Sequence, residues 1–286
     1  MKISVFTTAT RPDKRGDHVE QSIGSYTGLA DEVIYVDGGN LRETEYDIAW
    51  VNGAFVDPQI KIIKHHWPDE FDWKFIGEQF QRGYEACTGD WVIHADLDFV
   101  FHEQDYVAIR KAFEDNPDAP ALSFWKYQFI QPDRYNLKSR LVIAVNKGKY
   151  GDRIRFDSGG DLCQPSLDGK ELKPDNVPEA RIPFYNYEKI LKTEAQVKDD
   201  VGRMARAYER HFGEFKLGGP DDESAYQGWL NMQIGRNSKP QQHVALSFHP
   251  KVMHDTIRNL TPDQFGHSGF GFFKPSIYAK IATKEG

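Results

Sequence analysis

The first 115 residues alternate short β-rich runs with runs of helical periodicity, and no other feature of the chain constrains its fold as much. Four β-rich runs are expected to be strands, at residues 3–7, 32–37, 60–64 and 91–95. Apolar side chains recur at helical spacing in three further runs, at residues 18–26, 75–87 and 103–113. The alternation predicts an α/β fold with a doubly wound, mainly parallel central sheet flanked by helices.

Polar side chains follow three of these predicted strands. Thr7 and Thr8 end the first strand, and Asp37 ends the second. Asp96 and Asp98 follow the fourth strand. Because ligands of such sheets bind beyond the carboxyl ends of the strands, we expect a binding site where these residues converge.

The two carboxylates lie in the stretch GDWVIHADLDFVFHE, between two apolar runs. Carboxylates in such a frame are costly unless something binds them. Asp96 and Asp98 can present oxygens to one hard cation, and Mg²⁺ and Mn²⁺ prefer oxygen ligands. In the alternative interpretation, one of them caps the helix that starts near Glu103 and the other is solvated.

The remaining candidates in the first half each have a structural alternative. Asp37 is suited to a ribose or a base, but it also suits a turn before two glycines. Thr7, Thr8 and Arg11 could bind a base or diphosphate, or form a polar exit from the strand. Lys74, after Trp73, could neutralise a phosphate or be solvated.

The second half has weaker signals. Strands are expected at residues 121–130 and 141–145, and helices at 188–211 and 250–260. Residues 147–183 are rich in Gly, Asp and Pro, as in a site-forming loop region. We expect one domain over residues 1–286, in which the second half caps the sheet.

Composition excludes several classes of function. The formal net charge is −7 and no basic block is present, which disfavours nucleic-acid binding. Cys87 and Cys163 are far apart and are expected to be reduced thiols of a cytoplasmic protein. No apolar run is long enough to span a membrane, although the aromatic stretch at residues 270–273 is compatible with a peripheral membrane contact.

The ordered motifs of the first half resemble those of the family 2 glycosyltransferases. The resemblance is carried by VFTT at residues 5–8, EVIYVDGG at 32–39, QRGYEACTGDWVI at 81–93 and DLD at 96–98. It covers about the first 115 residues. Two later segments, IPFYNY at 182–187 and SFHPKVM at 247–253, look like parts of a bacterial and viral subgroup of that family.

The resemblance implies a GT-A-type, Rossmann-like fold and a nucleotide-sugar donor. A UDP-sugar is expected, with Mn²⁺ or Mg²⁺ on the diphosphate, a glycan or glycolipid acceptor and usually inversion at the anomeric carbon. By this resemblance residues 1–115 bind the donor and residues 116–286 form the acceptor half. The family often has Tyr-Asn where this chain has Ala9-Thr10, and Asn where it has Gln81.

Carried over by position, the resemblance assigns roles to individual residues. Thr7 and Asp37 would contact the base and ribose. Asp98 would be the direct metal ligand, and Asp96 would lie near the ribose and the metal. His249 could complete the metal shell, as a late histidine does in other GT-A enzymes, although a lone histidine is more often structural.

An inverting transfer needs a general base for the acceptor hydroxyl and a cation for the leaving diphosphate. Asp157 is the favoured base and Asp161 the second choice. The acids at residues 221–223 remain alternatives that could instead cap a helix. Besides the metal ion, Lys74 or Arg11 is expected to stabilise the departing diphosphate.

Two other functions are compatible with such a sheet. A sugar-1-phosphate nucleotidyltransferase would need a glycine-rich basic loop after the first strand, where this chain has TTATRPDKRG. A non-catalytic glycan- or nucleotide-binding protein would not need the intact Asp-x-Asp pair. We therefore expect a metal-dependent glycosyltransferase.

Overall fold

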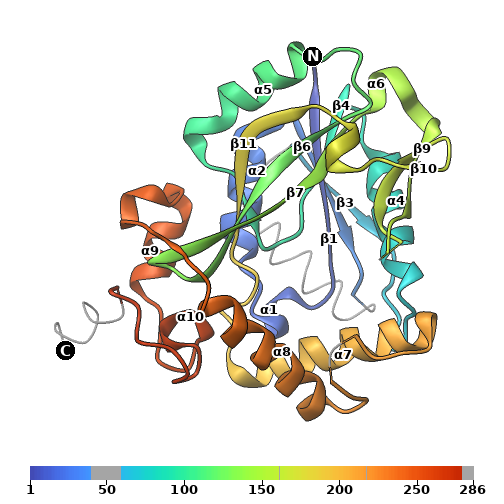
Figure 1. Cartoon of the computed structure of the whole chain (residues 1–286). Helices are drawn as coiled ribbons and strands as arrows, with labels where there is room; N and C mark the ends of the chain where they lie inside the picture. The colour runs from blue at the N-terminus through green and yellow to red at the C-terminus, as the bar shows by residue number, and fades with distance from the viewer. Residues whose placement is uncertain (40–58, 161, 217, 279–286) are drawn as a thin grey trace.

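A computed structural model describes residues 1–39, 59–160, 162–216 and 218–278 of the chain (Figure 1). The central sheet has the strand order β3-β2-β1-β4-β7-β6-β11-β5, and β12 pairs with β7. Its first four strands in that order pair in parallel. β7 then runs antiparallel to β4 and β6, and β11 runs parallel to β6. The predicted α/β fold with a central sheet flanked by helices is confirmed.

The strands of the central sheet follow the sequence signals closely in the first half. The parallel group consists of β1 (Ile3–Ala9), β2 (Glu32–Asp37), β3 (Ile60–Lys64) and β4 (Trp91–His94). The other strands are β5 (Phe99–Val100), β6 (Ala121–Gln131), β7 (Arg134–Asn146), β11 (Glu179–Asn186) and β12 (Gln242–His243).

Helices cover both faces of the parallel group. α2 (Val19–Leu29) and α5 (Tyr106–Glu114) share an apolar core with Val5 of β1. α4 (Lys74–Ala86) packs on the opposite face, where Phe6 is its neighbour. The alternation of side chains along β1 therefore assigns odd-numbered residues to the α2 face and even-numbered residues to the α4 face.

The region from residue 147 to 183, expected to be a loop, contains regular structure. β8 (Ile154–Ser158), β9 (Gln164–Leu167) and β10 (Lys170–Glu171) form a small antiparallel sheet beside α4. β11 then enters the central sheet between β6 and β5. Short turns flank these strands: α6 (Lys147–Tyr150), η2 (Gly151–Arg153) and η3 (Pro174–Asn176).

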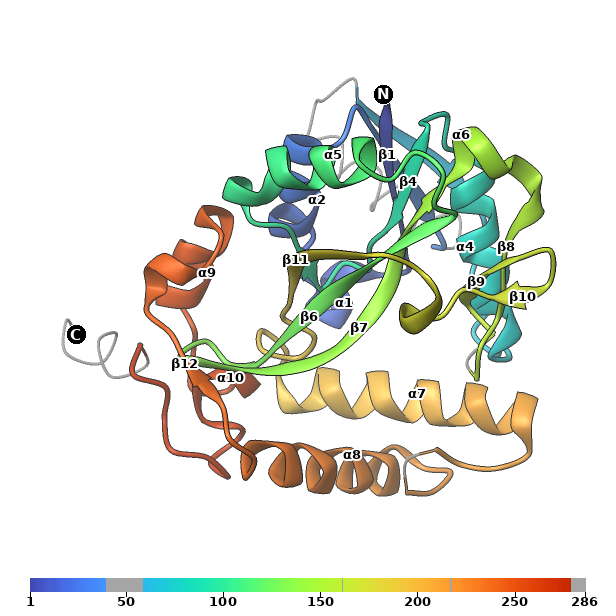
Figure 2. The ribbon, with the colours of Figure 1, turned by 45° about the horizontal axis from the view of Figure 1, so that its top comes forward.

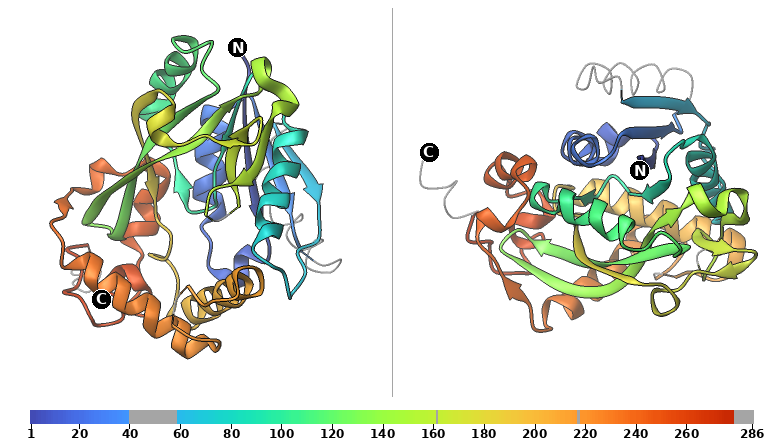
Figure 3. Two further views of the ribbon diagram at one scale, coloured as in Figure 1. Left: turned by 45° about the vertical axis from the view of Figure 1, so that its right-hand side comes forward. Right: turned by 90° about the horizontal axis from the view of Figure 1, so that it is seen from above.

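Two long helices close the carboxyl end of the parallel strands. α7 (Glu194–Phe212) and α8 (Asp222–Asn237) lie side by side below the sheet in Figure 2 and in the left view of Figure 3. α1 (Pro12–Arg15), which follows β1, packs against α7. The chain ends in short helices: η4 (Leu246–Phe248), η5 (Lys251–Met253), α9 (His254–Arg258) and α10 (Phe265–Ser268). No helix within the described ranges is both long and apolar enough to cross a bilayer.

Candidate active site

The backbone of the Asp96–Asp98 turn is fixed by polar side chains of α2. The Tyr26 hydroxyl lies 2.6 Å from the carbonyl oxygen of Asp96 and 3.0 Å from that of Phe99. The Ser22 hydroxyl donates to the carbonyl of Leu97 at 2.7 Å. These bonds satisfy backbone carbonyls in and beside the turn, and they hold the turn in one conformation.

The strand β11 supports the same turn from the other side. The backbone N–H of Tyr187, just beyond β11, donates to the carbonyl of Asp98 at 2.8 Å. η1 (Glu103–Asp105) follows the turn and is capped by His102, so neither aspartate caps it. The interpretation of one aspartate as a helix cap is therefore wrong.

The two carboxylates differ in their surroundings. The side chain of Asp96 is 46 % exposed and its Oδ1 lies 3.0 Å from His94 Nε2. Although burial acts to raise the pKa of Asp96, His94 and Lys126 lower it below its usual value. Burial, together with repulsion from Asp96, raises the pKa of Asp98 to about 7. Its Oδ1 has no hydrogen-bond partner among the described residues.

The turn opens onto a cavity of about 550 Å³ below the carboxyl ends of the parallel strands. Aromatic side chains of the α4 side, Trp67, Trp73 and Phe80, line it together with Trp229 of α8. Its polar lining is dense in charge of both signs. The acidic members are Asp17, Asp96, Asp98, Glu188 and Asp200, and the basic members are Arg15, Lys126, Lys189, Lys192, Arg203, Lys216 and Arg236.

Three of the residues expected to bind the nucleotide sugar or metal line this cavity: Thr8, Asp96 and Asp98. Thr7 does not, because it is an odd-numbered residue of β1, is fully buried and points to the α2 face. The pleat of β1 therefore separates the two threonines. Only Thr8 projects from the cavity side.

The other nucleotide-binding candidates lie outside the cavity lining. Asp37 is buried and its Oδ1 accepts from the N–H of Gly39 at 3.0 Å, as in the turn interpretation. Arg11 pairs with Asp69 at 3.4 Å. Lys74 is 66 % exposed and lies 3.8 Å from Glu78 on the outer surface of α4.

The favoured base also lies away from the cavity. Asp157 is exposed on β8 and its Oδ1 accepts from the Ser166 hydroxyl at 2.7 Å. It does not line the cavity that contains Asp98. The second choice, Asp161, lies outside the described residues.

The late histidine is part of the packed core. His249 is 1 % exposed, its Nδ1 lies 2.8 Å from the Tyr187 hydroxyl and its Nε2 lies 2.7 Å from the Pro132 carbonyl. Burial lowers the pKa of His249 to about 4. Both ring nitrogens are engaged within the protein, which matches the structural interpretation of a lone histidine.

Most charged residues of the cavity lining were not anticipated from the sequence, among them Glu188 and Lys126. Glu188 follows the buried end of β11 and accepts a hydrogen bond from Gln128 at 2.8 Å. Lys126, on β6, faces the cavity with its ammonium 5.6 Å from the centre of the Phe99 ring. Glu188, like Asp98, is a carboxylate that comes shortly after a buried strand, and this pattern could have indicated it. That strand, β11, was not predicted from the sequence.

The carboxylate oxygens of Asp96 and Asp98 suit a hard divalent cation that takes only some of its ligands from the protein. Within the described ranges, no three His, Cys, Asp or Glu side chains are grouped as a metal cage would require. Asp98 has an unpartnered buried oxygen and Asp96 is partly exposed beside it. Mg²⁺ and Mn²⁺ are commonly held by one or two carboxylates, with water and substrate phosphate completing the shell.

Comparison with known proteins returns structural likeness only. The sequence matches no family profile and no curated protein. Residues 1–349 of S. aureus TarS, in complex with UDP, match with a TM-score of 0.44 and 10 % identity over 92 % of this chain and 80 % of that chain. The mannosyltransferase PcManGT from Pyrobaculum calidifontis, in complex with GDP-Man and Mn²⁺, matches with a TM-score of 0.41 and 11 % identity over 82 % and 71 % of the two chains.

The match covers less of other structures. It spans 35 % of the chain of TarS in complex with UDP-GlcNAc, at a TM-score of 0.35 and 13 % identity over 45 % of this chain. These TM-scores are all below 0.5, so the function of this chain has to be argued from its own side chains.

Proposed function

We propose that this protein is a metal-dependent glycosyltransferase that moves a sugar from a nucleotide-diphosphate sugar to a hydroxyl group of a glycan or another acceptor. The observation that carries the proposal is the Asp96–Asp98 turn. It presents one partly exposed carboxylate and one unpartnered carboxylate oxygen to a cavity of about 550 Å³. The cavity lies at the carboxyl ends of parallel strands, where ligands of such sheets bind.

In this proposal Asp98, with Asp96 beside it, would hold Mn²⁺ or Mg²⁺. A divalent ion there would neutralise charge on a diphosphate. The hydrogen bonds from the Tyr26 and Ser22 hydroxyls to backbone carbonyls of the turn hold the carboxylates in place without reorganisation.

Lys126 is the side chain best placed to assist the leaving diphosphate. It lines the cavity, and its positive charge lowers the pKa of both Asp96 and Asp98, against the larger effect of burial. Lys74 and Arg11 lie outside the lining. The role first expected of them therefore passes to Lys126 in this proposal.

Glu188 is the carboxylate that we propose as general base. It lines the cavity and its charge acts on Asp98, whereas Asp157 faces away. The hydrogen bond from Gln128 orients one carboxylate oxygen at 2.8 Å. A base positioned against an acceptor hydroxyl would support an inverting displacement.

The test is a thermal-shift screen with UDP and GDP, each with and without Mn²⁺. Stabilisation by a nucleoside diphosphate that requires Mn²⁺ is expected, because binding to the native state alone raises its stability. Indifference to both nucleotides in the presence of Mn²⁺ would refute the proposal.

A further inference from the structure

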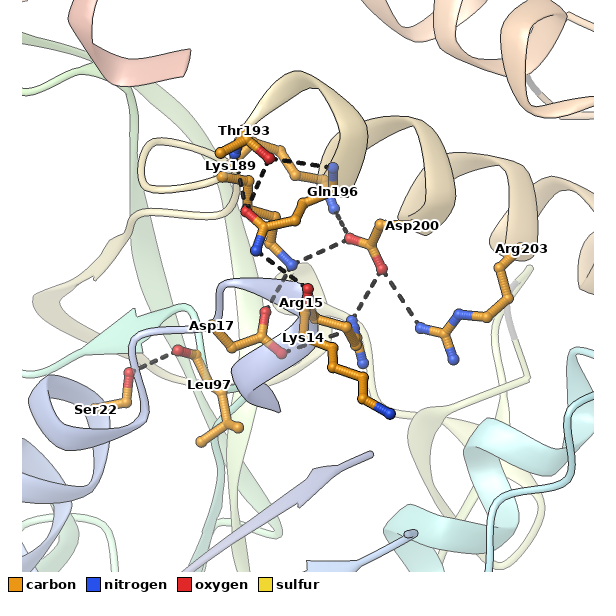
Figure 4. A network of polar contacts seen from close by, with 11 residues as sticks. Lys14, Arg15, Asp17, Ser22, Leu97, Lys189, Thr193, Gln196, Asp200 and Arg203 are labelled. Atoms are coloured by element: carbon orange, nitrogen blue, oxygen red, sulfur yellow. Dashed lines mark hydrogen bonds and ion pairs between the residues drawn. The ribbon is translucent and has the colours of Figure 1, made fainter. Parts of the chain in front are cut away.

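Six charged side chains form a cluster in the wall of the cavity, between α1 and α7 (Figure 4). We call it the cationic cluster, and it consists of Arg15, Asp17, Lys189, Lys192, Asp200 and Arg203. None of them belongs to the Asp96–Asp98 turn.

Asp200 of α7 is the centre of the cationic cluster. Its carboxylate lies 3.0 Å from Arg15 Nη2, 3.3 Å from Lys192 Nζ and 3.4 Å from Arg203 Nη2. Lys189 also donates to it. Asp17 lies 2.6 Å from Lys192 Nζ and 3.7 Å from Arg15 Nε.

The cationic cluster has more positive than negative charge. Four cations share two carboxylates, which leaves an excess of two positive charges within it. Three neighbouring carboxylates offset this excess only in part: Asp98 acts on Arg15, Glu188 on Lys189 and Asp199 on Arg203. Its side chains are only 3 to 22 % exposed, so water screens this excess poorly. Neighbouring His18 adds no charge near neutral pH, because burial lowers its pKa to about 4.

The excess positive charge faces the cavity. All six residues line it, and Arg15 Nε is buried without a hydrogen-bond partner among the described residues. The Arg203 guanidinium lies 5.5 Å from the centre of the Phe71 ring, and burial followed by repulsion from Arg15 lowers its pKa to about 10. A charge-assisted hydrogen bond to an anion would give Arg15 Nε a partner, and the charge of the anion would offset the repulsion between Arg15 and Arg203.

Two further cations line the cavity. Lys216 lies over the rings of Trp73 and Tyr208, at 5.4 and 5.1 Å from their centres. Arg236 projects from α8. The cavity is therefore lined by cations from both long helices and by carboxylates at the Asp96–Asp98 turn.

We infer that the cationic cluster binds an anionic group, a phosphate or a carboxylate, carried by the acceptor. The inference rests on the proposed function and names the class of acceptor that it would take. Three of the four cations belong to the segment from Lys189 to Arg203, in the half of the chain assigned to the acceptor. In the proposed function, the diphosphate of the donor is neutralised instead by a metal ion at Asp98.

The first test uses the wild-type protein and inorganic phosphate at constant ionic strength. The ¹⁵N–¹H signals of the arginine side chains report binding, in the presence and absence of saturating UDP with Mg²⁺, which is diamagnetic and leaves these signals observable. Phosphate is expected to shift the Arg15 and Arg203 signals to the same extent under both conditions. A shift that UDP with Mg²⁺ abolishes would assign the cationic cluster to the donor diphosphate and overturn the inference, as would no shift at all.

The second test compares two arginines of the same helix. Arg203→Gln is expected to raise the half-saturating phosphate concentration about tenfold, because it removes a charge-assisted bond. Arg206→Gln is the control, since Arg206 pairs with Asp222 at 2.5 Å and does not line the cavity. Equal effects of the two substitutions would overturn the inference.

Arg203→Lys keeps the charge and is expected to restore most of the phosphate affinity. It also controls for folding, because it preserves the pairing with Asp200. UDP binding with Mn²⁺ is measured on every variant and is expected to stay within about twofold of wild type. Failure of the wild type to bind either UDP or GDP with Mn²⁺ would contradict the proposed function, whereas failure to bind phosphate alone would contradict only this inference.

Discussion

The Asp96–Asp98 turn and the cationic cluster line one cavity but carry an excess of opposite charge, negative at the turn and positive at the cluster. In the turn, two carboxylates lie together and Asp98 has an unpartnered oxygen. In the cationic cluster, four cations share two carboxylates. Arg15 acts on Asp96 and Asp98 acts on Arg15, so the two regions compensate each other in part. In our proposals, a cation at the turn and an anion at the cationic cluster supply the remaining compensation.

The largest effect is expected from removing a carboxylate of the Asp96–Asp98 turn. Asp98→Asn removes the proposed metal ligand, so Mn²⁺-dependent UDP binding should be lost and transfer should fall on the order of 100-fold or more. Titration calorimetry with UDP and Mn²⁺ measures this. Asp157→Asn is the matched control, because that carboxylate lies outside the cavity and its loss should leave UDP affinity unchanged. Unchanged affinity in Asp98→Asn would exclude it as a ligand.

The next substitution sharpens the assignment of the base. Glu188→Gln keeps the shape of the side chain but removes its basicity, so kcat should fall about 10²- to 10⁴-fold while UDP binding is retained. Steady-state kinetics on Asp157→Asn provide the comparison. If Asp157→Asn loses transfer and Glu188→Gln does not, the base is the one first expected from the sequence.

On the cationic side, Asp200→Asn leaves four buried cations with one carboxylate. The free energy of unfolding should fall by about 3 to 5 kcal/mol, as when one partner of a buried pair is removed. Urea unfolding measures the change. Asp199→Asn is the control, since its neighbouring carboxylate is exposed and should change stability by less than about 0.5 kcal/mol. Equal losses would show that the pairing of Asp200 contributes nothing specific.

A smaller effect is expected at the support of the turn. Tyr26→Phe deletes the hydroxyl near the carbonyls of Asp96 and Phe99, and it should cost about 1 to 2 kcal/mol of unfolding free energy. Denaturant titration gives this value. Metal-dependent UDP binding should weaken only modestly, because the carboxylates remain. An unchanged unfolding free energy in Tyr26→Phe would show that the turn keeps its conformation without this hydroxyl.

The smallest effect is expected in the pH dependence of the unfolding free energy that Asp200 contributes. Burial acts to raise the pKa of Asp200, but Lys189, Arg15 and Lys192 lower it well below its usual value of 3.8. The pairing therefore stabilises the fold fully above about pH 4 and is lost as pH falls further. The stability difference between wild type and Asp200→Asn should be constant above pH 4 and shrink below it, by at most about 1.4 kcal/mol per pH unit. Urea unfolding between pH 2.5 and 6 tests this.

Much of the first half of the fold was predictable because its signals are local. The runs at residues 32–37 and 60–64 coincide with β2 and β3, since each is a short apolar run bounded by turn residues. β11 was missed because Pro183 and the surrounding Gly, Asp and Pro residues indicate a loop. The strand tolerates Pro183 beside an irregularity in its pairing with β6, between Glu179 and Pro183.

The candidate site was predictable only in part. Asp96, Asp98 and Thr8 line the cavity, as expected of residues at strand ends. Thr7 faces the α2 side instead, because successive side chains of a strand alternate between its faces. Glu188 depended on β11, so the error in the strand prediction also hid the carboxylate that follows it.

The sequence alone determined the β-rich runs, the helices between them and the carboxylate pair at a strand end. These depend on neighbours within a few residues, through side-chain periodicity and backbone preference. Only the tertiary structure decided which charges meet. Arg15 and Asp200 are 185 positions apart but lie 3.0 Å from each other. Coulomb attraction and desolvation depend on distance and burial in space, and spacing along the chain records neither.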